Sequence, residues 1–222
     1  MVMLRPRLRT LPDAQRRLWA ELGAVPRGFV LYGGTALALR FAHRSSEDFD
    51  FFSNQPFVPG ELEVEIPFLR GAVRLQSFPN TLVSRVDRGG PVKVSFFGGL
   101  GLRRVRDPDA VEEVPGLLIA SPLDLAASKV KVVQDRAESK DYLDVARLLE
   151  DGIDLAAALG AAQAVYGSAF NPLPSLKALC YFGDGDLMSL PMAVRARLVE
   201  AVGRVDPLRI PEIPALSGGI AP

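Results

Sequence analysis

The feature that most constrains this chain is a short apolar run that stops at two glycines and is followed by a run with two aspartates. The first run, FVLY at 29–32, is long enough for a buried strand and too short for a buried helix. Gly33 and Gly34 end it, and residues 35–41 have the composition of a short helix. The next run, at 46–52, reads SEDFDFF. The stretch predicts a strand, a glycine turn, a helix and a second strand, in that order.

The glycine turn is suited to binding an anion. Glycine has no Cβ, so the backbone N–H groups of Gly33 and Gly34 can come close to a phosphate. The N-terminus of the following helix adds a partial positive charge at the same place. Taken alone, a pair of glycines before a helix is more often an ordinary tight turn.

The second strand supplies candidate metal ligands. Asp48 and Asp50 are two residues apart, so both carboxylates leave the same face of a strand, roughly 7 Å apart. Phe49 and Phe51 then point to the opposite face, toward a core. Mg²⁺ and Mn²⁺ prefer such oxygen ligands, and Mg²⁺ typically takes one or two carboxylates together with substrate phosphates. Alone, the pair could be a solvated strand end, but beside a phosphate-binding turn it favours nucleotide transfer.

The rest of the chain predicts strands first and helices later. Strand-like composition recurs three times before residue 100 and once near residue 118, and seven segments have helical character. We therefore expect an α+β fold, with an α/β lobe over residues 1–120 and a helical lobe over residues 121–222. The expected strands are 72–78, 81–87, 91–97 and 117–120, and the expected helices are 12–22, 59–69, 121–136, 139–149, 154–166, 174–181 and 191–202, followed by an extended tail.

Composition limits the surroundings and the partners. The formal net charge is zero, so no global field attracts the chain to nucleic acid or to a membrane, and an RNA-binding surface would have to be local. The arginines before residue 10 and those at 103–106 could form such a surface or be ordinary solvated residues. One cysteine, Cys180, excludes an internal disulfide and suits a reducing cytosol. No apolar run is long enough for a membrane span and no signal-peptide core is seen, so we expect a cytoplasmic protein.

Two blocks of sequence resemble a known family. GGTALAL at 33–39, followed by the pattern H-R-x-S-x-D-x-D-F-F at 43–52, is similar to the signature of the AbiEii/AbiGii toxin family of nucleotidyltransferases. That family belongs to the polymerase-β-like nucleotidyltransferase superfamily. The segment 129–149, KVKVVQDRAESKDYLDVARLL, resembles the family's second conserved block. The resemblance covers residues 25–150. It implies a nucleotidyltransferase fold with a mixed sheet, followed by a C-terminal helical lobe.

The resemblance also implies an activity and partners. The enzyme would move a nucleoside monophosphate from an NTP to an acceptor and release pyrophosphate, with Mg²⁺ or Mn²⁺ as the cofactor. The acceptor would be tRNA or another RNA, and a cognate antitoxin protein would be a partner. Two alternatives stay open at this point: a catalytically silent relative that binds a nucleotide or a protein, and a phosphotransfer enzyme acting on a small molecule.

Roles for individual residues follow from the same resemblance. Asp48 and Asp50 would bind the metal, and Lys129 would neutralise the triphosphate. Asp141 would act as a base or as an orienting group. These four form the expected catalytic set, and the expected nucleotide-binding residues are Gly33, Gly34, Thr35, Arg44 and Lys129, with the Thr35 hydroxyl donating to phosphate. Without the resemblance, Lys129 would be read as a solvated helix lysine, and Asp141 and Asp144 as an exposed helix start.

One position departs from the superfamily pattern. A third acidic residue is expected on the strand beside the two aspartates, and the equivalent position here is Ser95. A hydroxyl is a much poorer Mg²⁺ ligand than a carboxylate. Either Glu47, Asp87 or Asp141 supplies the missing carboxylate, or the site holds one metal firmly and a second loosely. The single histidine, His43, is expected to be structural or to face a phosphate rather than to act as a base.

Overall fold

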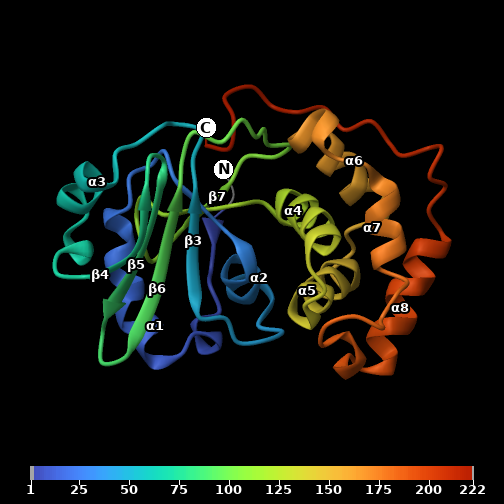
Figure 1. Cartoon of the computed structure of the whole chain (residues 1–222), viewed down its shortest axis with the longest axis horizontal. Coiled ribbons are helices and arrows are strands. Elements are labelled where there is room, and N and C mark those ends of the chain that lie inside the picture. Colours follow the sequence, from blue (N-terminus) through green and yellow to red (C-terminus); the bar gives the residue numbers. More distant parts are fainter. Residues whose placement is uncertain (1–2, 222) are drawn as a thin grey trace. The chain divides into compact units, whose positions relative to one another are not determined.

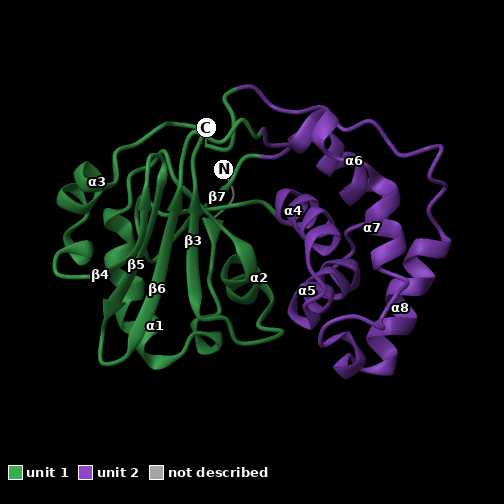
Figure 2. Cartoon of the chain, in the orientation of Figure 1, with its two compact units in different colours: residues 1–102, 107–121, 218–222 green, residues 103–106, 122–217 purple. Residues whose placement is uncertain are grey.

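The computed structural model describes residues 3–221, which divide into two compact units (Figure 2). Within the described chain, the first unit contains residues 3–102, 107–121 and 218–221. The second contains residues 103–106 and 122–217. The short segments 103–106 and 218–221 therefore each belong to a different unit from the residues that precede them. Each unit is described by itself below.

Across residues 3–221 the strands form one eight-stranded sheet in the first unit, in the order β1-β7-β8-β2-β3-β6-β5-β4 (Figure 1). The sheet is mixed, because β3 pairs antiparallel with β2 and parallel with β6. The α+β fold class expected from the sequence is confirmed. The strands are β1 Met3–Leu4, β2 Val30–Tyr32, β3 Asp48–Phe52, β4 Val73–Phe78, β5 Thr81–Asp87, β6 Pro91–Phe97, β7 Asp109–Val111 and β8 Leu118–Ile119.

Alternation along β3 separates a core face from an open face. Phe49 and Phe51 are fully buried, and the ring of Phe51 stacks on that of Phe96 in β6 with the centroids 5.2 Å apart. Because successive strand residues point to opposite faces, burying the two phenylalanines turns Asp48 and Asp50 to the other side of the sheet. The apolar residues of β3 thus fix the direction of its acidic ones.

Among the described residues of the first unit, three α-helices accompany the sheet: α1 Asp13–Trp19, α2 Gly33–Phe41 and α3 Pro59–Glu65. The expected single helix over 59–69 is wrong, since α3 ends at Glu65 and a separate 3-10 turn covers Pro67–Leu69. The break occurs at Ile66, which is extended with φ −92° and ψ 109°. A residue before proline is disfavoured in the helical region, and Pro67 has no N–H to continue the helix.

The second unit is helical, and α4 is its central element. Helix α4, Pro122–Asp135, packs against α5, α6 and α7, while α8 packs on α5. The expected helix at 174–181 begins earlier, because Asn171 caps α7 by accepting a hydrogen bond from the N–H of Leu173 (3.0 Å) and Pro172 occupies its first turn. The remaining bounds are α5 Ser139–Glu150, α6 Leu155–Tyr166, α7 Pro172–Ala178 and α8 Met192–Gly203.

The segments near both ends are held in place. The Arg7 N–H donates to the Leu39 carbonyl (2.8 Å), and β1 pairs with β7. In the tail, the Leu216 N–H donates to the Arg104 carbonyl (2.7 Å) within the second unit, and Ile220 is buried in the first. Residues 1–2 of the expected lead-in lie outside the described residues. None of the helices in residues 3–221 is long and apolar enough to cross a membrane.

A buried ion pair ties α2 to the sheet inside the first unit. The guanidinium of Arg40, in the last turn of α2, lies 2.7 Å from the carboxylate of Asp109 in β7. It also donates to the carbonyls of Ala120 (2.5 Å) and Ile119 (3.2 Å), next to β8. Burial lowers the pKa of Arg40, and the charge of Asp109 opposes that effect. The pair therefore fixes the helix that begins at the glycine turn.

Replacing Asp109 with alanine should strongly destabilise the first unit. The substitution leaves the Arg40 charge buried without its carboxylate, and breaking a buried pair from one side costs about 3–5 kcal/mol. Urea unfolding followed by circular dichroism measures the loss. Glu113→Ala, an exposed carboxylate in the loop after β7, is the control and should change the free energy of unfolding by less than about 1 kcal/mol. Equal effects of the two substitutions would contradict the assignment.

Candidate functional site

Gly33 connects β2 to α2 in a conformation that favours glycine. Its φ is +75°, in the left-handed region. A Cβ built at this position would lie 3.1 Å from Oδ2 of Asp50. The absence of a side chain therefore lets the Asp50 carboxylate come directly against the turn. The first N–H groups of a helix have no partner within it, so the start of α2 presents donors beside this carboxylate.

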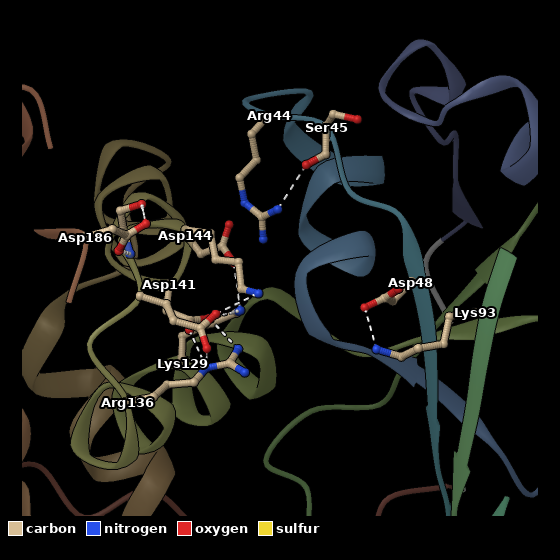
Figure 3. Close-up of polar contacts among 12 residues, drawn as sticks. Arg44, Ser45, Asp48, Lys93, Lys129, Arg136, Asp141, Asp144 and Asp186 are labelled. Carbon is tan, nitrogen blue, oxygen red and sulfur yellow. Dashed lines mark hydrogen bonds and ion pairs between the residues drawn. The ribbon is translucent and has the colours of Figure 1, made fainter. Parts of the chain in front are cut away.

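Gly34 allows a second close approach, by Arg44. A Cβ at Gly34 would clash with the guanidinium of Arg44 and would lie 3.2 Å from Oγ of Ser46. Arg44 also donates to the carbonyl of Ser45 (3.0 Å; Figure 3). A guanidinium thus lies next to the N-terminus of α2, and both are favourable for a phosphate. Two of the expected nucleotide-binding residues, Gly34 and Arg44, are in contact.

Thr35 has a different use from the one expected. Its side chain is buried, and its hydroxyl lies within hydrogen-bond distance of the Ser46 hydroxyl (2.8 Å) and donates to the Asp48 carbonyl. A hydroxyl carries one proton, so in this structure Thr35 holds the start of β3 against α2 rather than pointing a donor outward. Its contribution to anion binding would come from its backbone N–H.

On the open face of the sheet, the two aspartates of β3 lie opposite residues of β6. Asp48 lies opposite Lys93, and Asp50 lies opposite Ser95. The Lys93 ammonium is 2.8 Å from the Asp48 carboxylate, and the two side chains are 44% and 45% exposed (Figure 3). Lys93 was not among the expected site residues. Its position two residues before Ser95 on an expected strand, on the same face, was the available signal.

Of the three candidates for the missing third carboxylate, Glu47 is exposed, Asp87 is engaged elsewhere and Asp141 lies in the other unit. Ser95 is buried opposite Asp50. The Asp87 carboxylate accepts hydrogen bonds from the N–H groups of Gly89 (2.8 Å) and Gly90 (3.1 Å), so it closes the β5–β6 turn. Asp141 belongs to the second unit. Among residues 3–221, no group of three or more histidine, cysteine or acidic side chains is arranged to hold a metal.

The two carboxylates beside the glycine turn still fit a magnesium ion. Mg²⁺ keeps several waters and is usually bound through one or two carboxylates and substrate phosphates. Asp48 and Asp50 share one face of β3, and the turn brings Asp50 to within contact of Gly33. The donor set therefore suits an ion that has further ligands from a nucleotide, and it does not suit an ion held by protein alone.

A buried charge cluster forms in the second unit, between α4 and α5. The ammonium of Lys129 is 2.6 Å from the carboxylate of Asp141 and 2.7 Å from that of Asp144 (Figure 3). The guanidinium of Arg136 is 2.7 Å from Asp141. Both aspartate side chains are 0% exposed, and that of Lys129 is 5% exposed. The simpler alternatives, a solvated lysine and an exposed helix start, are therefore wrong.

The environment of Asp141 favours its charged form. Burial acts to raise the pKa of Asp141, but hydrogen bonds from Arg136 and Lys129 and the charges of both outweigh burial and hold the pKa below its ordinary value. A buried carboxylate with a lowered pKa and two cationic partners is a weak proton acceptor at neutral pH. The geometry therefore supports the orienting role expected for Asp141 over the role of a base.

Two further candidates from the sequence, the arginines at 103–106 and His43, lie in different surroundings. Arg104 is buried and donates to the Ser217 carbonyl (3.0 Å), so it anchors the tail instead of forming a phosphate rim. His43 packs against Phe41, with the ring centroids 6.3 Å apart. It also lines a hollow of about 440 Å³ in the first unit. The other residues that line this hollow are Arg9, Thr10, Leu11, Pro12, Ala42, Arg44 and Ser45.

Asp141→Asn should destabilise the second unit in a pH-dependent manner. The folded pKa of Asp141 is lowered, so its stabilising effect is complete above the ordinary carboxyl pKa and is lost as pH falls through the folded value. We expect a loss of about 3 kcal/mol at pH 7, shrinking below about pH 4. Urea unfolding from pH 3 to 7 measures the difference.

Asp151→Asn is the matched control for that experiment. Asp151 follows the same helix, but its side chain is 44% exposed and lies 3.5 Å from Arg147. Its replacement should change stability by less than about 1 kcal/mol at every pH. A difference between wild type and Asp141→Asn that stays constant down to pH 3 would contradict the proposed charge state of Asp141.

Comparisons with known proteins agree with this geometry. The family model described as "Nucleotidyl transferase AbiEii toxin, Type IV TA system" matches residues 17–213. An uncharacterized protein of Aquifex aeolicus (strain VF5) is 33% identical over 119 residues, which are 53% of this chain and 55% of that protein. The chain thus spans about half the length of this curated relative.

Two solved structures share the fold at low sequence identity. MenT4, a nucleotidyltransferase toxin of Mycobacterium tuberculosis H37Rv, has a TM-score of 0.60 at 16% identity, covering 86% of this chain and 82% of that one. A candidate nucleotidyltransferase from H. pylori has a TM-score of 0.52 at 18% identity, covering 85% and 91%. Because the family model matches residues 17–213, most of the chain's 222 residues, the chain belongs to the AbiEii family of nucleotidyltransferase toxins.

Proposed function

We propose that this nucleotidyltransferase uses an NTP and Mg²⁺, both bound at the open face of the sheet in the first unit. The observation that carries the proposal is the contact between the glycine turn and the second aspartate, where a Cβ at Gly33 would lie 3.1 Å from Asp50. Hydrogen-bond donors that could bind a phosphate and carboxylates that could bind a metal are adjacent there. A metal–triphosphate complex needs this adjacency, because the triphosphate oxygens bind the metal ion and also accept hydrogen bonds from the backbone N–H groups.

The residues of this site have separate tasks. The N–H groups at the start of α2 and the guanidinium of Arg44 bind the β- and γ-phosphates, while the buried Thr35 hydroxyl fixes β3 next to them. Asp48 and Asp50 hold the metal. When bound by these carboxylates, Mg²⁺ would supply positive charge to the phosphates. The protein thus contributes mostly position and electrostatics.

The proposed reaction is an in-line displacement at the α-phosphorus. A hydroxyl oxygen of the acceptor forms a bond to this phosphorus, and the bond to the oxygen that bridges to the β-phosphate breaks. Pyrophosphate leaves with that oxygen, and the hydroxyl proton passes to solvent. In the second unit, Lys129 and Asp141 hold each other in a fixed, desolvated arrangement. We propose that Asp141 and Asp144 fix and orient the Lys129 ammonium.

We further propose an RNA acceptor, with tRNA as the first candidate, and an antitoxin partner. The antitoxin follows from the family, which is described as part of a type IV toxin–antitoxin system. A local cationic surface supports the RNA acceptor, because Arg9 and Arg44 line one hollow in the first unit. The formal net charge of zero makes such a local surface necessary.

Calorimetric titration of each NTP, with and without Mg²⁺, tests the nucleotide site. We expect binding that needs the metal and that falls at least about tenfold in Asp48→Ala/Asp50→Ala, because the metal then loses both protein ligands. Transfer of label from α-³²P-NTP to total RNA tests the reaction. Binding that is indifferent to metal and aspartates, together with no label transferred from any of the four NTPs, would refute the proposal.

Gly34→Ala should weaken nucleotide binding more than the same substitution at a glycine with open space around it. The added methyl group occupies the space of the Arg44 guanidinium, so the arginine must leave the helix N-terminus. We expect about a tenfold loss of NTP affinity by calorimetry. Gly60→Ala is the control, since no atom lies within 4 Å of a Cβ built there. Unchanged NTP affinity in Gly34→Ala would remove Arg44 from the site.

A further inference from the structure

Lys93 places a positive charge on one of the two proposed metal ligands. Its ammonium is 2.8 Å from Oδ2 of Asp48, and both side chains are close to half exposed. The contact follows from the backbone, because Asp48 and Lys93 are opposite each other in the parallel β3–β6 pairing. Register partners on one face of a sheet remain neighbours as long as the sheet is intact. The lysine therefore competes with any other cation for Asp48.

The next pair of residues along the same two strands adds one negative charge, that of Asp50, and no second one. Asp50 lies opposite Ser95, which is buried and neutral. The four positions on this face thus hold two carboxylates, one ammonium and one hydroxyl. Since Asp87 is engaged in the β5–β6 turn, it does not compensate. The site attracts a free divalent ion much less than a site of three carboxylates would.

A metal–nucleotide complex meets a different balance of charges. The triphosphate supplies negative charge and oxygen ligands to the ion, and its own charge is attracted by the start of α2 and by Arg44. The repulsion between Lys93 and the ion is then offset by the phosphates. Lys93 thus opposes the binding of metal alone more than the binding of metal with nucleotide.

We propose that Lys93 acts as a resident cation on Asp48, so that the site discriminates against a free divalent ion and admits the ion together with the nucleotide. This inference rests on the proposed function. Lys93 is a positioning and specificity residue here, and no part in bond making or breaking is assigned to it. Its half-exposed side chain allows it to leave Asp48 when the complex arrives.

Binding of Mn²⁺ alone, with the full chain and no nucleotide, is the direct test. Electron paramagnetic resonance measures free Mn²⁺ and needs no catalytic activity. Lys93→Met and Lys93→Gln remove the charge at an exposed position and should bind Mn²⁺ about tenfold more tightly than the wild type. Lys93→Arg keeps the charge and should stay within about threefold of the wild type.

Arg85→Gln is the matched control for a general effect of charge. Arg85 is exposed and lies opposite Lys93 in β5, one strand farther from Asp48. If direct contact with Asp48 is what matters, removing the charge of Arg85 should change Mn²⁺ affinity by less than about threefold. Equal effects of Arg85→Gln and Lys93→Gln would overturn the proposal, as would Mn²⁺ affinities in Lys93→Met and Lys93→Gln that are unchanged or weaker.

A second measurement uses the coupling between metal and nucleotide. Mn²⁺ affinity is measured with and without a non-hydrolysable NTP analogue. The affinity with the analogue divided by the affinity without it should be larger in the wild type than in Lys93→Gln. Equal ratios would overturn the inference. Failure of the proposed function has a different signature. In that case NTP binding would be absent, or would not depend on Asp48 and Asp50, in the wild type and in the Lys93 variants alike.

Discussion

The parallel pairing of β3 with β6 is the constraint on which the rest of the site depends. Its register sets Asp48 opposite Lys93 and Asp50 opposite Ser95, while Phe51 stacks on Phe96 on the buried face. A slip of one residue in β3 would turn both aspartates into the core and the phenylalanines into solvent. The hydrophobic face therefore enforces the geometry of the polar one. The stability of the core and the placement of the proposed metal ligands come from the same alternation.

Much of this arrangement could be predicted from local sequence. The order of strand, glycine turn, helix and acidic strand follows from residue pattern within one short stretch, and the structure has these elements in that order. The interruption at Pro67 was also local, and the general rule against helix before proline would have placed it. Lys93 could not be assigned so directly. Its partner lies 45 residues away, and pairing between distant strands is set by tertiary contacts that no local pattern contains.

Burial was the second property that the sequence did not reveal. Lys129, Asp141 and Asp144 have the spacing of ordinary helix-surface residues, and only the packing of α4 on α5 shows that they are enclosed together. Each charge there loses its hydration, so the cluster persists because its members satisfy one another. Thr35 shows the same limit on a smaller scale: its hydroxyl suited a phosphate in the sequence, but in the folded unit it belongs to the carbonyl of Asp48.

Ser95 and Lys93 are best understood together. Replacing a third carboxylate with a hydroxyl weakens the attraction for metal, and a lysine on Asp48 weakens it further. Neither change should weaken the proposed attraction for a triphosphate, which we assign to the start of α2 and to Arg44. The two departures therefore act in the same direction: each lowers affinity for the ion alone and leaves the affinity for phosphate intact. In the proposed site the nucleotide would bring both the missing negative charge and the missing ligands, which is the physical reason to expect selection of the complex over its parts.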